Sequence, residues 1–189
     1  ASSNDEDTAK HIELGMLAIE RARCKLEAGR DVVVLLDSLT RLGRAFNNSK
    51  KYGNSGRTMS GGIDSRALEI PKQLFGAARK AEEGGSLTII ATCLVDTGSR
   101  ADQIIFEEFK GTGNMELILD RSIAEKRLFP AINLAASGTR KEDLLMGEQE
   151  IKTVTALRRR LISMPPAVQI EQLLKAIERY PTNADLVKG

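Results

Sequence analysis

The 189-residue sequence is short of the residues that build metal centres and disulfide frameworks. It has only two cysteines, Cys24 and Cys93, and a single histidine, His11, far from both of them. These spacings exclude a zinc cluster and a set of disulfide bridges. Two isolated cysteines are typical of a protein in a reducing cytosol, and we therefore expect a cytoplasmic localisation.

Long apolar runs and a strong net charge are absent as well. No stretch approaches the length of a transmembrane helix, and residues 1–7 are polar and acidic, unlike a signal peptide, so we expect no membrane partner. The net charge is only +2, which means that any surface for nucleic acid must be local. The sequence also lacks an initiator methionine, which indicates an internal segment of a longer chain.

The strongest positive signal is the run DVVVLLD from Asp31 to Asp37, in which five apolar residues end on a carboxylate. An apolar run without alternation is typical of a strand covered on both faces in a parallel sheet. Open α/β folds bind ligands at the carboxyl edge of such a sheet. Asp37 therefore stands where a nucleotide-bound Mg²⁺ would lie, as in a Walker B strand. The alternative is that Asp37, or Ser38 after it, only caps the next helix.

Helix and strand signals alternate around this run and predict one α/β domain without internal repeats. Helices are expected over residues 8–28, 39–46, 67–81 and 101–109, and strands over residues 86–95, 115–119 and 128–132. Another helix is expected to open at Ser137, because Thr139 and Glu142 have the spacing of a capping box. Two helices broken at Pro165–Pro166 follow, with 158–160 as a solvated basic face.

Two loops carry residues suited to a polyanion. Residues 47–65 are polar, glycine-rich and basic, and they cannot order themselves by burying apolar surface. They form either a flexible linker or a loop that orders on nucleic acid, with Tyr52 as a stacking group. The second loop, Asp96–Arg100, follows a predicted strand at the edge where ligands bind.

Several sequence blocks follow one another in a distinctive order. The blocks are Asp37, Ser38, Thr40, Arg41 and Arg44, then GAAR from Gly76, EEGGSLTIIAT from Glu82, DTGS from Asp96, EEFKGTGNMEL from Glu107, AEKR from Ala124, FPAI from Phe129 and SGTRKE from Ser137. In these blocks the sequence resembles the family of bacterial transcription termination factors called Rho. The match runs from near Ala1 to about Leu145 and continues more loosely to the C-terminus.

The resemblance implies a RecA-like P-loop NTPase core, a mostly parallel sheet with flanking helices, of which residues 1–189 are the C-terminal portion ending in helices. It also implies an ATP-dependent RNA translocase and helicase that terminates transcription by pulling on nascent RNA. The implied cofactors are ATP and Mg²⁺, and the implied partners are a homohexamer, single-stranded nascent RNA, RNA polymerase and elongation factors. The sequence contains no G-x-x-x-x-G-K-[ST] motif, so we expect the P-loop and the RNA-binding domain to precede Ala1 and the chain alone to be inactive.

The resemblance further implies roles for single residues of the nucleotide site. Asp37 matches the Walker B ligand of Mg²⁺, and Phe129 matches the aromatic residue that packs on adenine. Three arginines match catalytic positions: Arg41 in the nucleotide site, Arg140 as the arginine finger that reaches the γ-phosphate of the neighbouring subunit, and Arg127 close to the same interface.

The two loops match the family's Q-loop, residues 49–64, and R-loop, Asp96–Arg100, which face RNA in a central pore. The RNA-binding residues implied are Lys50, Lys51, Arg57, Thr58, Gly61, Gly62, Thr97, Gly98, Ser99 and Arg100. Two alternatives stay open. One is another RecA-fold hexameric motor, such as a DNA recombinase or a rotary-ATPase-like export subunit, and the other is a non-catalytic truncated fragment.

Overall fold

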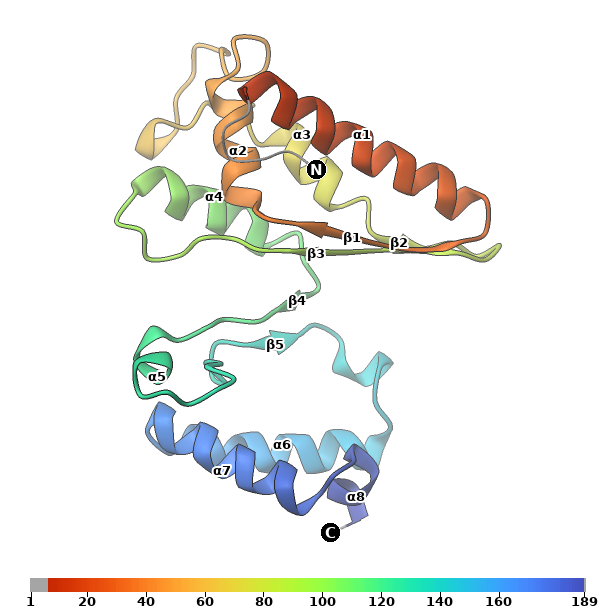
Figure 1. Cartoon of the computed structure of the whole chain (residues 1–189), viewed down its shortest axis with the longest axis vertical. Helices are drawn as coiled ribbons and strands as arrows, with labels where there is room; N and C mark the ends of the chain where they lie inside the picture. The colour runs from red at the N-terminus through yellow and green to blue at the C-terminus, as the bar shows by residue number, and fades with distance from the viewer. Residues whose placement is uncertain (1–6, 189) are drawn as a thin grey trace. The chain divides into compact units, whose positions relative to one another are not determined.

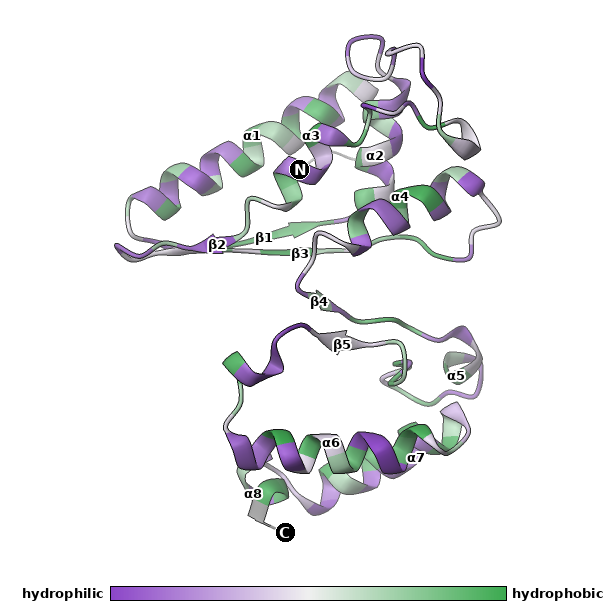
Figure 2. Cartoon of the chain, turned by 180° about the vertical axis from the view of Figure 1, so that it is seen from behind, coloured by the Kyte–Doolittle hydropathy of each residue, from purple (hydrophilic) through white to green (hydrophobic). Residues whose placement is uncertain are grey.

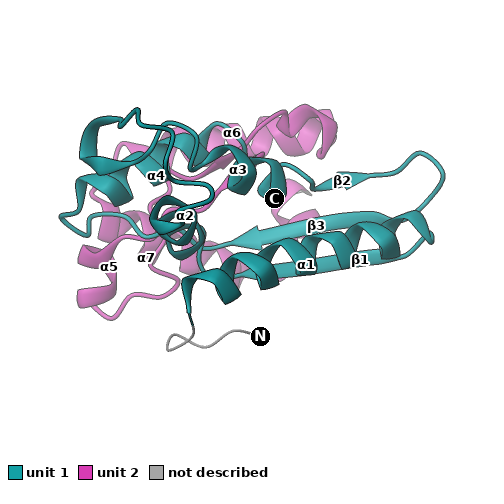
Figure 3. Cartoon of the chain, turned by 90° about the horizontal axis from the view of Figure 1, so that it is seen from above, with its two compact units in different colours: residues 1–113 teal, residues 114–189 magenta. Residues whose placement is uncertain are grey.

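The computed structural model of the chain describes residues 7–188, which divide into two compact units (Figure 3). Unit 1 covers residues 1–113 and unit 2 covers residues 114–189. No change of composition marks residue 113, which is why the sequence predicts a single domain. Among the residues described, no helix is both long and apolar enough to cross a membrane.

Unit 1 is a small sheet with helices packed on it (Figure 1). Its elements are α1 (Thr8–Glu27), β1 (Asp31–Leu36), α2 (Leu39–Asn48), the 3₁₀ turn η1 (Ser60–Gly62), α3 (Glu69–Phe75), β2 (Arg79–Lys80), β3 (Ser86–Ala91) and α4 (Arg100–Lys110). The strand order is β1-β3-β2, in which β1 and β3 are parallel and β2 runs antiparallel to β3. The carboxyl ends of β1 and β3 therefore meet at one edge, with Leu36 opposite Ala91.

One face of this sheet carries the main core. Ile19 of α1 and Phe46 of α2 are fully buried against the sheet, together with Leu87 of β3. β1 and β3 are the apolar strands seen in Figure 2. The other face is open among the residues described: Val33 and Leu35 are 62% and 76% exposed. The prediction that β1 is covered on both faces is therefore wrong for this chain, because apolar helices reach only the side chains that point to one face.

Several boundaries in unit 1 differ from the predicted ones. The helix expected over 67–81 ends at Phe75, where Gly76 caps it, and residues 79–80 form β2 instead. Gly84 and Gly85 have positive φ, which closes the hairpin between β2 and β3. The strand expected over 86–95 ends at Ala91, because the segment after it turns away to contact α2.

Unit 2 consists of short strands followed by helices. Its elements are β4 (Met115–Glu116), α5 (Arg121–Glu125), β5 (Gly138–Thr139), the 3₁₀ turn η2 (Glu142–Leu144), α6 (Glu148–Ile162), α7 (Pro166–Arg179) and α8 (Asn183–Lys188). Its core joins Ile123 of α5, Ile170 of α7 and Ala131 of the loop between α5 and β5. The predicted break at Pro165–Pro166 is confirmed.

The helix expected to open at Ser137 is wrong. Gly138 and Thr139 pair with Glu116 and Met115 as an antiparallel strand, and Lys141 is left-handed with φ 51°. The strands expected over 115–119 and 128–132 shrink to β4 and to an isolated bridge between Leu119 and Ile132. Pairing with a distant strand here outweighs the local capping pattern.

Arg158 also departs from its predicted place on a solvated face. It is half-buried, and its guanidinium donates hydrogen bonds to the carbonyl oxygens of Leu134, at 3.0 Å, and of Ser137, at 2.9 Å. Arg159 and Arg160 are exposed, as expected. Arg158 thus ties α6 to the loop that leads into β5.

Candidate functional site

Asp37 lies at the carboxyl end of β1, where the predicted Walker B carboxylate should be. The hydroxyl of Thr92, just after β3, donates a 2.6 Å hydrogen bond to Oδ1 of Asp37. The backbone N–H of Leu39 donates to the carbonyl of Thr92 at 2.8 Å, which fixes the start of α2 to the same edge. The cap of α2 is Ser38, whose Oγ accepts from the N–H of Arg41. Asp37 is thus exposed at the sheet edge and is not the helix cap.

A pocket of about 450 Å³ brings Asp37 and Arg41 together. It lies between α1, β1 and α2, and His11 and Leu14 of α1 also line it. A carboxylate oxygen is a ligand that Mg²⁺ prefers, and a guanidinium suits phosphate oxygens, so this pair fits a magnesium-bound nucleotide. Residues 7–188 hold no cluster of three or more His, Cys, Asp or Glu that could bind a metal ion. Asp37 would supply one oxygen ligand to such an ion.

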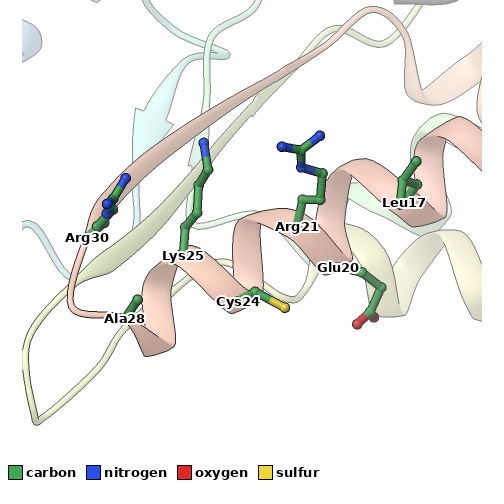
Figure 4. Close-up of a pocket in the computed structure, with 7 residues that line it drawn as sticks. All are labelled: Leu17, Glu20, Arg21, Cys24, Lys25, Ala28 and Arg30. Atoms are coloured by element: carbon green, nitrogen blue, oxygen red, sulfur yellow. The ribbon is translucent and has the colours of Figure 1, made fainter.

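A second pocket of about 450 Å³ opens on the outer side of α1 (Figure 4). Its lining residues are Leu17, Glu20, Arg21, Cys24, Lys25, Ala28 and Arg30. None of them belongs to the predicted site, and the pocket does not contain Asp37 or Arg41.

The other predicted nucleotide-site residues belong to unit 2. Phe129 is 58% exposed and Arg127 is also exposed, with a left-handed backbone at φ 60°. Arg140 follows β5 rather than lying in a first helical turn. Its backbone N–H donates to the carbonyl of Asn114 at 2.9 Å, and its guanidinium is 3.9 Å from Oε1 of Glu116. These exposed side chains can reach a ligand or a neighbouring molecule.

The first predicted loop, residues 47–65, is ordered by a polar network together with apolar burial, since Ile63 is 1% exposed in a core cluster and Tyr52 packs against the main core. Asp64 is 6% exposed and accepts hydrogen bonds from the N–H of Arg66, at 2.9 Å, and from the N–H and hydroxyl of Ser55, at 2.6 and 2.8 Å. These hydrogen bonds lower the pKa of Asp64 below its ordinary value, and the bond from the N–H of Arg66 has the largest effect. Asn47 accepts from the N–H of Asp64 and donates to the carbonyl of Gly62.

The expectation that this loop is disordered without a ligand is therefore wrong for its central part. Tyr52 is also not placed to stack on a base. Its ring packs on the buried ring of Phe46, with centroids 5.1 Å apart, and Lys51 lies over its face. Lys50, Arg57 and Thr58 are exposed, as a binding surface requires.

The second predicted loop is held by a residue that sequence reasoning missed, Asp102. This carboxylate is 1% exposed. It accepts two hydrogen bonds from the Arg44 guanidinium, at 2.8 Å from Nε and at 2.5 Å from a terminal nitrogen. The hydroxyl of Thr97 donates to it at 2.7 Å. The hydrogen bond from Arg44 lowers the pKa of Asp102 below its ordinary value, and Thr97 adds to this effect. The Ser99-x-x-Asp102 spacing of a helix N-terminus was the signal that could have found it.

The two loops meet at Gly61. This glycine has φ 77°, and a Cβ added to it would lie 3.0 Å from the carbonyl atoms of Arg100 and 2.9 Å from the side chain of Ile104. This close approach and the positive φ both favour glycine here. Residues 57–62 and 97–100 thus form one continuous region, called here the loop surface, on which Arg57 and Arg100 are exposed.

Comparison with known proteins identifies the fold. The family model of the ATP synthase alpha/beta family, nucleotide-binding domain, matches residues 1–139. A solved ATPase from the type III secretion system of pathogenic bacteria aligns with 99% of this chain and 60% of its own, with a TM-score of 0.80 and 19% identity. The assembled ATPase EscN of the type III secretion system of enteropathogenic E. coli aligns with 99% of this chain and 51% of its own, at a TM-score of 0.71 and 20% identity. These structures confirm the predicted α/β fold class with helices at the C-terminal end.

Relatives found by sequence have a much higher sequence identity to this chain than these two structures have. Transcription termination factor Rho of Akkermansia muciniphila is 54% identical over 187 residues, which is 99% of this chain and 39% of the relative. Those of Borreliella burgdorferi and Streptomyces lividans are 52% and 54% identical, over 36% and 26% of their lengths. The predicted resemblance to this family is confirmed, and the chain spans only about two fifths or less of these relatives.

Proposed function

We propose, since the chain belongs to the ATP synthase alpha/beta family of nucleotide-binding domains, that it is the C-terminal part of the ATPase domain of a Rho-type transcription terminator. The longer protein would use ATP hydrolysis to move along nascent RNA in the cytoplasm, as a homohexamer, and to release transcripts from RNA polymerase together with elongation factors. Identity of 52–54% over nearly the whole chain supports this family of motors over export ATPases, which are 19–20% identical.

The residues proposed for nucleotide chemistry come from both units of the chain. Asp37 would hold Mg²⁺ and Arg41 would contact phosphate from the shared pocket, while Phe129 would pack on adenine. Bound Mg²⁺ would neutralise charge that develops on the transferred phosphoryl group. Arg140 would act on the γ-phosphate of a neighbouring subunit, with Arg127 beside that interface. The Arg140 side chain is 56% exposed, so it is accessible to a neighbouring subunit.

The observation that carries the RNA proposal is the contact between Gly61 and Arg100. It joins a basic, glycine-rich loop and a second polar loop that ends at Arg100, from distant parts of the sequence, into one exposed loop surface. The RNA-binding residues proposed there are those of the two loops named above, with Arg57 and Arg100 as the principal cations. Guanidinium groups contact phosphate and 2′-hydroxyl groups regardless of base, which suits a motor that must step along any transcript.

The test uses the full-length protein and the variant Arg100→Ala. We expect ATP turnover of the wild-type protein to be stimulated by single-stranded RNA and much less by single-stranded DNA. Arg100→Ala should lower this stimulation and RNA unwinding without lowering ATP affinity, because Arg100 is not among the residues that line the Asp37 pocket. Equal stimulation by RNA and DNA would favour another motor of this fold. Unchanged stimulation and unwinding in both Arg100→Ala and Arg57→Ala would contradict the loop surface as the RNA site.

A further inference from the structure

The segment that follows β3 connects the Asp37 pocket with the loop surface. It begins at Thr92, whose hydroxyl donates to Asp37 and whose carbonyl accepts from the N–H of Leu39. It ends at Thr97, in the second loop. Between these points it runs beside α2, the ten-residue helix that starts directly after the Asp37–Ser38 pair. One end of both α2 and this segment thus lies at the nucleotide pocket.

Thr40 of α2 binds the middle of this segment. This side chain is fully buried, and its hydroxyl oxygen accepts a 2.9 Å hydrogen bond from the N–H of Leu94. The thiol of Cys93 lies 3.4 Å from the same oxygen. Because the Thr40 hydroxyl is buried, breaking this hydrogen bond would leave a buried acceptor without its partner, which is costly in free energy.

Asp102 holds the far end of this segment, because it accepts hydrogen bonds from both Arg44 of α2 and Thr97 of the second loop. Because Asp102 is 1% exposed, it has no surface on which to touch RNA or nucleotide. Its contacts instead link the position of α2 to that of Thr97: the Arg44 side chain is 50% exposed, but its bidentate pair with the buried carboxylate fixes the geometry of both groups.

We propose that Asp102 is a positioning residue that couples the nucleotide pocket to the loop surface, through Arg44 on one side and Thr97 on the other. The inference rests on the proposed function, because it concerns how nucleotide at Asp37 and RNA at Arg100 influence each other. Thermodynamic linkage makes that influence reciprocal: RNA changes nucleotide affinity by the same factor by which nucleotide changes RNA affinity. This coupling factor is what Asp102 sets.

The experiment measures the coupling factor in the full-length protein. The Kd of a non-hydrolysable ATP analogue is determined with and without a saturating single-stranded homopolymer RNA, and the Kd of that RNA with and without the analogue. In Asp102→Asn we expect the ratio of the two nucleotide Kd values to fall towards 1 by about threefold or more. The nucleotide Kd without RNA should stay unchanged, because the Asp37 pocket is intact.

Two further sets of variants guard against a general loss of structure. Glu108→Gln removes another carboxylate of α4, which forms a 2.8 Å ion pair with Lys72 of α3, and it should keep the wild-type coupling factor. Thr97→Val keeps the Arg44–Asp102 pair but removes the hydroxyl that donates to Asp102, and it should also lose coupling. Because Thr97 is itself among the proposed RNA-binding residues, the readout is the coupling factor and not the RNA Kd alone. Thr97→Ser keeps a hydroxyl and should retain the coupling.

The outcomes separate this inference from its premise. A wild-type coupling factor of 1 would overturn this inference, whereas a wild-type protein whose ATP turnover is not stimulated by RNA would contradict the proposed function. If the wild-type protein shows coupling, two results for Asp102→Asn would overturn the positioning role. In one, the variant keeps the full coupling factor, and in the other it loses nucleotide affinity and RNA affinity in equal proportion. The same would follow if Glu108→Gln lost as much coupling as Asp102→Asn. Should Asp102→Asn fail to assemble, the contrast between Thr97→Val and Thr97→Ser decides the matter.

Discussion

At the scale of single residues, the carboxylates of unit 1 differ in role according to whether they are exposed or buried. Asp37 is exposed at a sheet edge, where it accepts from a threonine hydroxyl and is open to a cation. Asp64 and Asp102 are buried and hold loops in place through several donors each, which lowers their pKa values. Exposure and donor count, and not residue type, separate the binding carboxylate from the organising ones.

The first prediction concerns Asp37. In the full-length protein, Asp37→Asn should lower kcat by about 100-fold or more, because the metal ion supplies several kcal/mol of transition-state stabilisation. Steady-state turnover at saturating ATP and ordinary Mg²⁺ concentration checks this result.

Asp31→Asn is the matched control. Asp31 lies at the other end of β1 and accepts a 2.6 Å hydrogen bond from the hydroxyl of Ser86, as Asp37 does from Thr92. We expect near-normal kcat for this control. Equal kcat in the two variants would mean that Asp37 has no role beyond its contact with Thr92.

At the scale of elements, the two loops owe their shape to polar contacts with neighbouring helices. The Asn47 side chain at the end of α2 fixes Asp64 and Gly62, and Arg44 of the same helix fixes Asp102 at the start of α4. α2 therefore supports both loops as well as the edge at Asp37. Its side chains hold the loop surface in place, together with the apolar packing of Met59 and Ile63.

The element-scale prediction uses Gly61. In the full-length protein, Gly61→Ala should reduce RNA-stimulated ATP turnover and lower the free energy of unfolding, because a methyl group would collide with the backbone of Arg100. Gly56→Ala is the control, since Gly56 has φ 76° and no atom lies within 4 Å of the position that a methyl group would take there. In both variants the left-handed backbone costs roughly 1–2 kcal/mol.

The difference between the two variants isolates the contact between the loops. It is measured by denaturant unfolding and by turnover at saturating RNA. If Gly56→Ala were as harmful as Gly61→Ala on both measures, backbone strain alone would account for the result and the loop contact would carry no function.

At the scale of the whole molecule, the chain is two compact units, each with part of the proposed machinery. Unit 1 holds Asp37, Arg41 and the loop surface, and unit 2 holds Arg127, Phe129 and Arg140. Such a division of residues is consistent with a motor whose subunits complete each other. The open apolar face of β1, at Val33 and Leu35, shows that this chain by itself leaves core positions exposed.

The prediction at this scale is that Arg140 acts across a subunit boundary. Full-length subunits with Arg140→Ala should assemble and bind ATP but hydrolyse it slowly, since an arginine finger contributes about 10³–10⁵ in rate. Mixed with subunits that lack a working P-loop, they should recover activity, because some interfaces then combine two intact halves. ATP turnover of the mixture at varied subunit ratios measures this effect.

Arg121→Ala provides the matched control for Arg140. Arg121 is an exposed arginine of the same unit that pairs with Glu125 on its own helix, and its loss should leave turnover unchanged. Mixtures that show no more activity than either parent would argue against a site shared between subunits.

Local sequence patterns alone determine several elements of this protein's secondary structure and the family that it resembles. The run from Asp31 to Asp37 predicts a strand that ends on a carboxylate at the sheet edge, because an apolar stretch and its terminating charge are adjacent in sequence. Pro165–Pro166 likewise predicts a helix break through the missing N–H and fixed φ of proline. The resemblance to the Rho family also follows from contiguous blocks of sequence, and the relatives confirm it.

Only the tertiary structure decided the features that depend on distant partners. Gly138 and Thr139 form a strand because Met115 and Glu116 lie beside them, against a local helix signal. The Arg44–Asp102 pair joins residues 58 positions apart. Such partners are brought together by packing of the helices, and no local periodicity records which carboxylate a guanidinium will meet. For the same physical reason, the meeting of the two loops at Gly61 and Arg100 could be seen only in three dimensions.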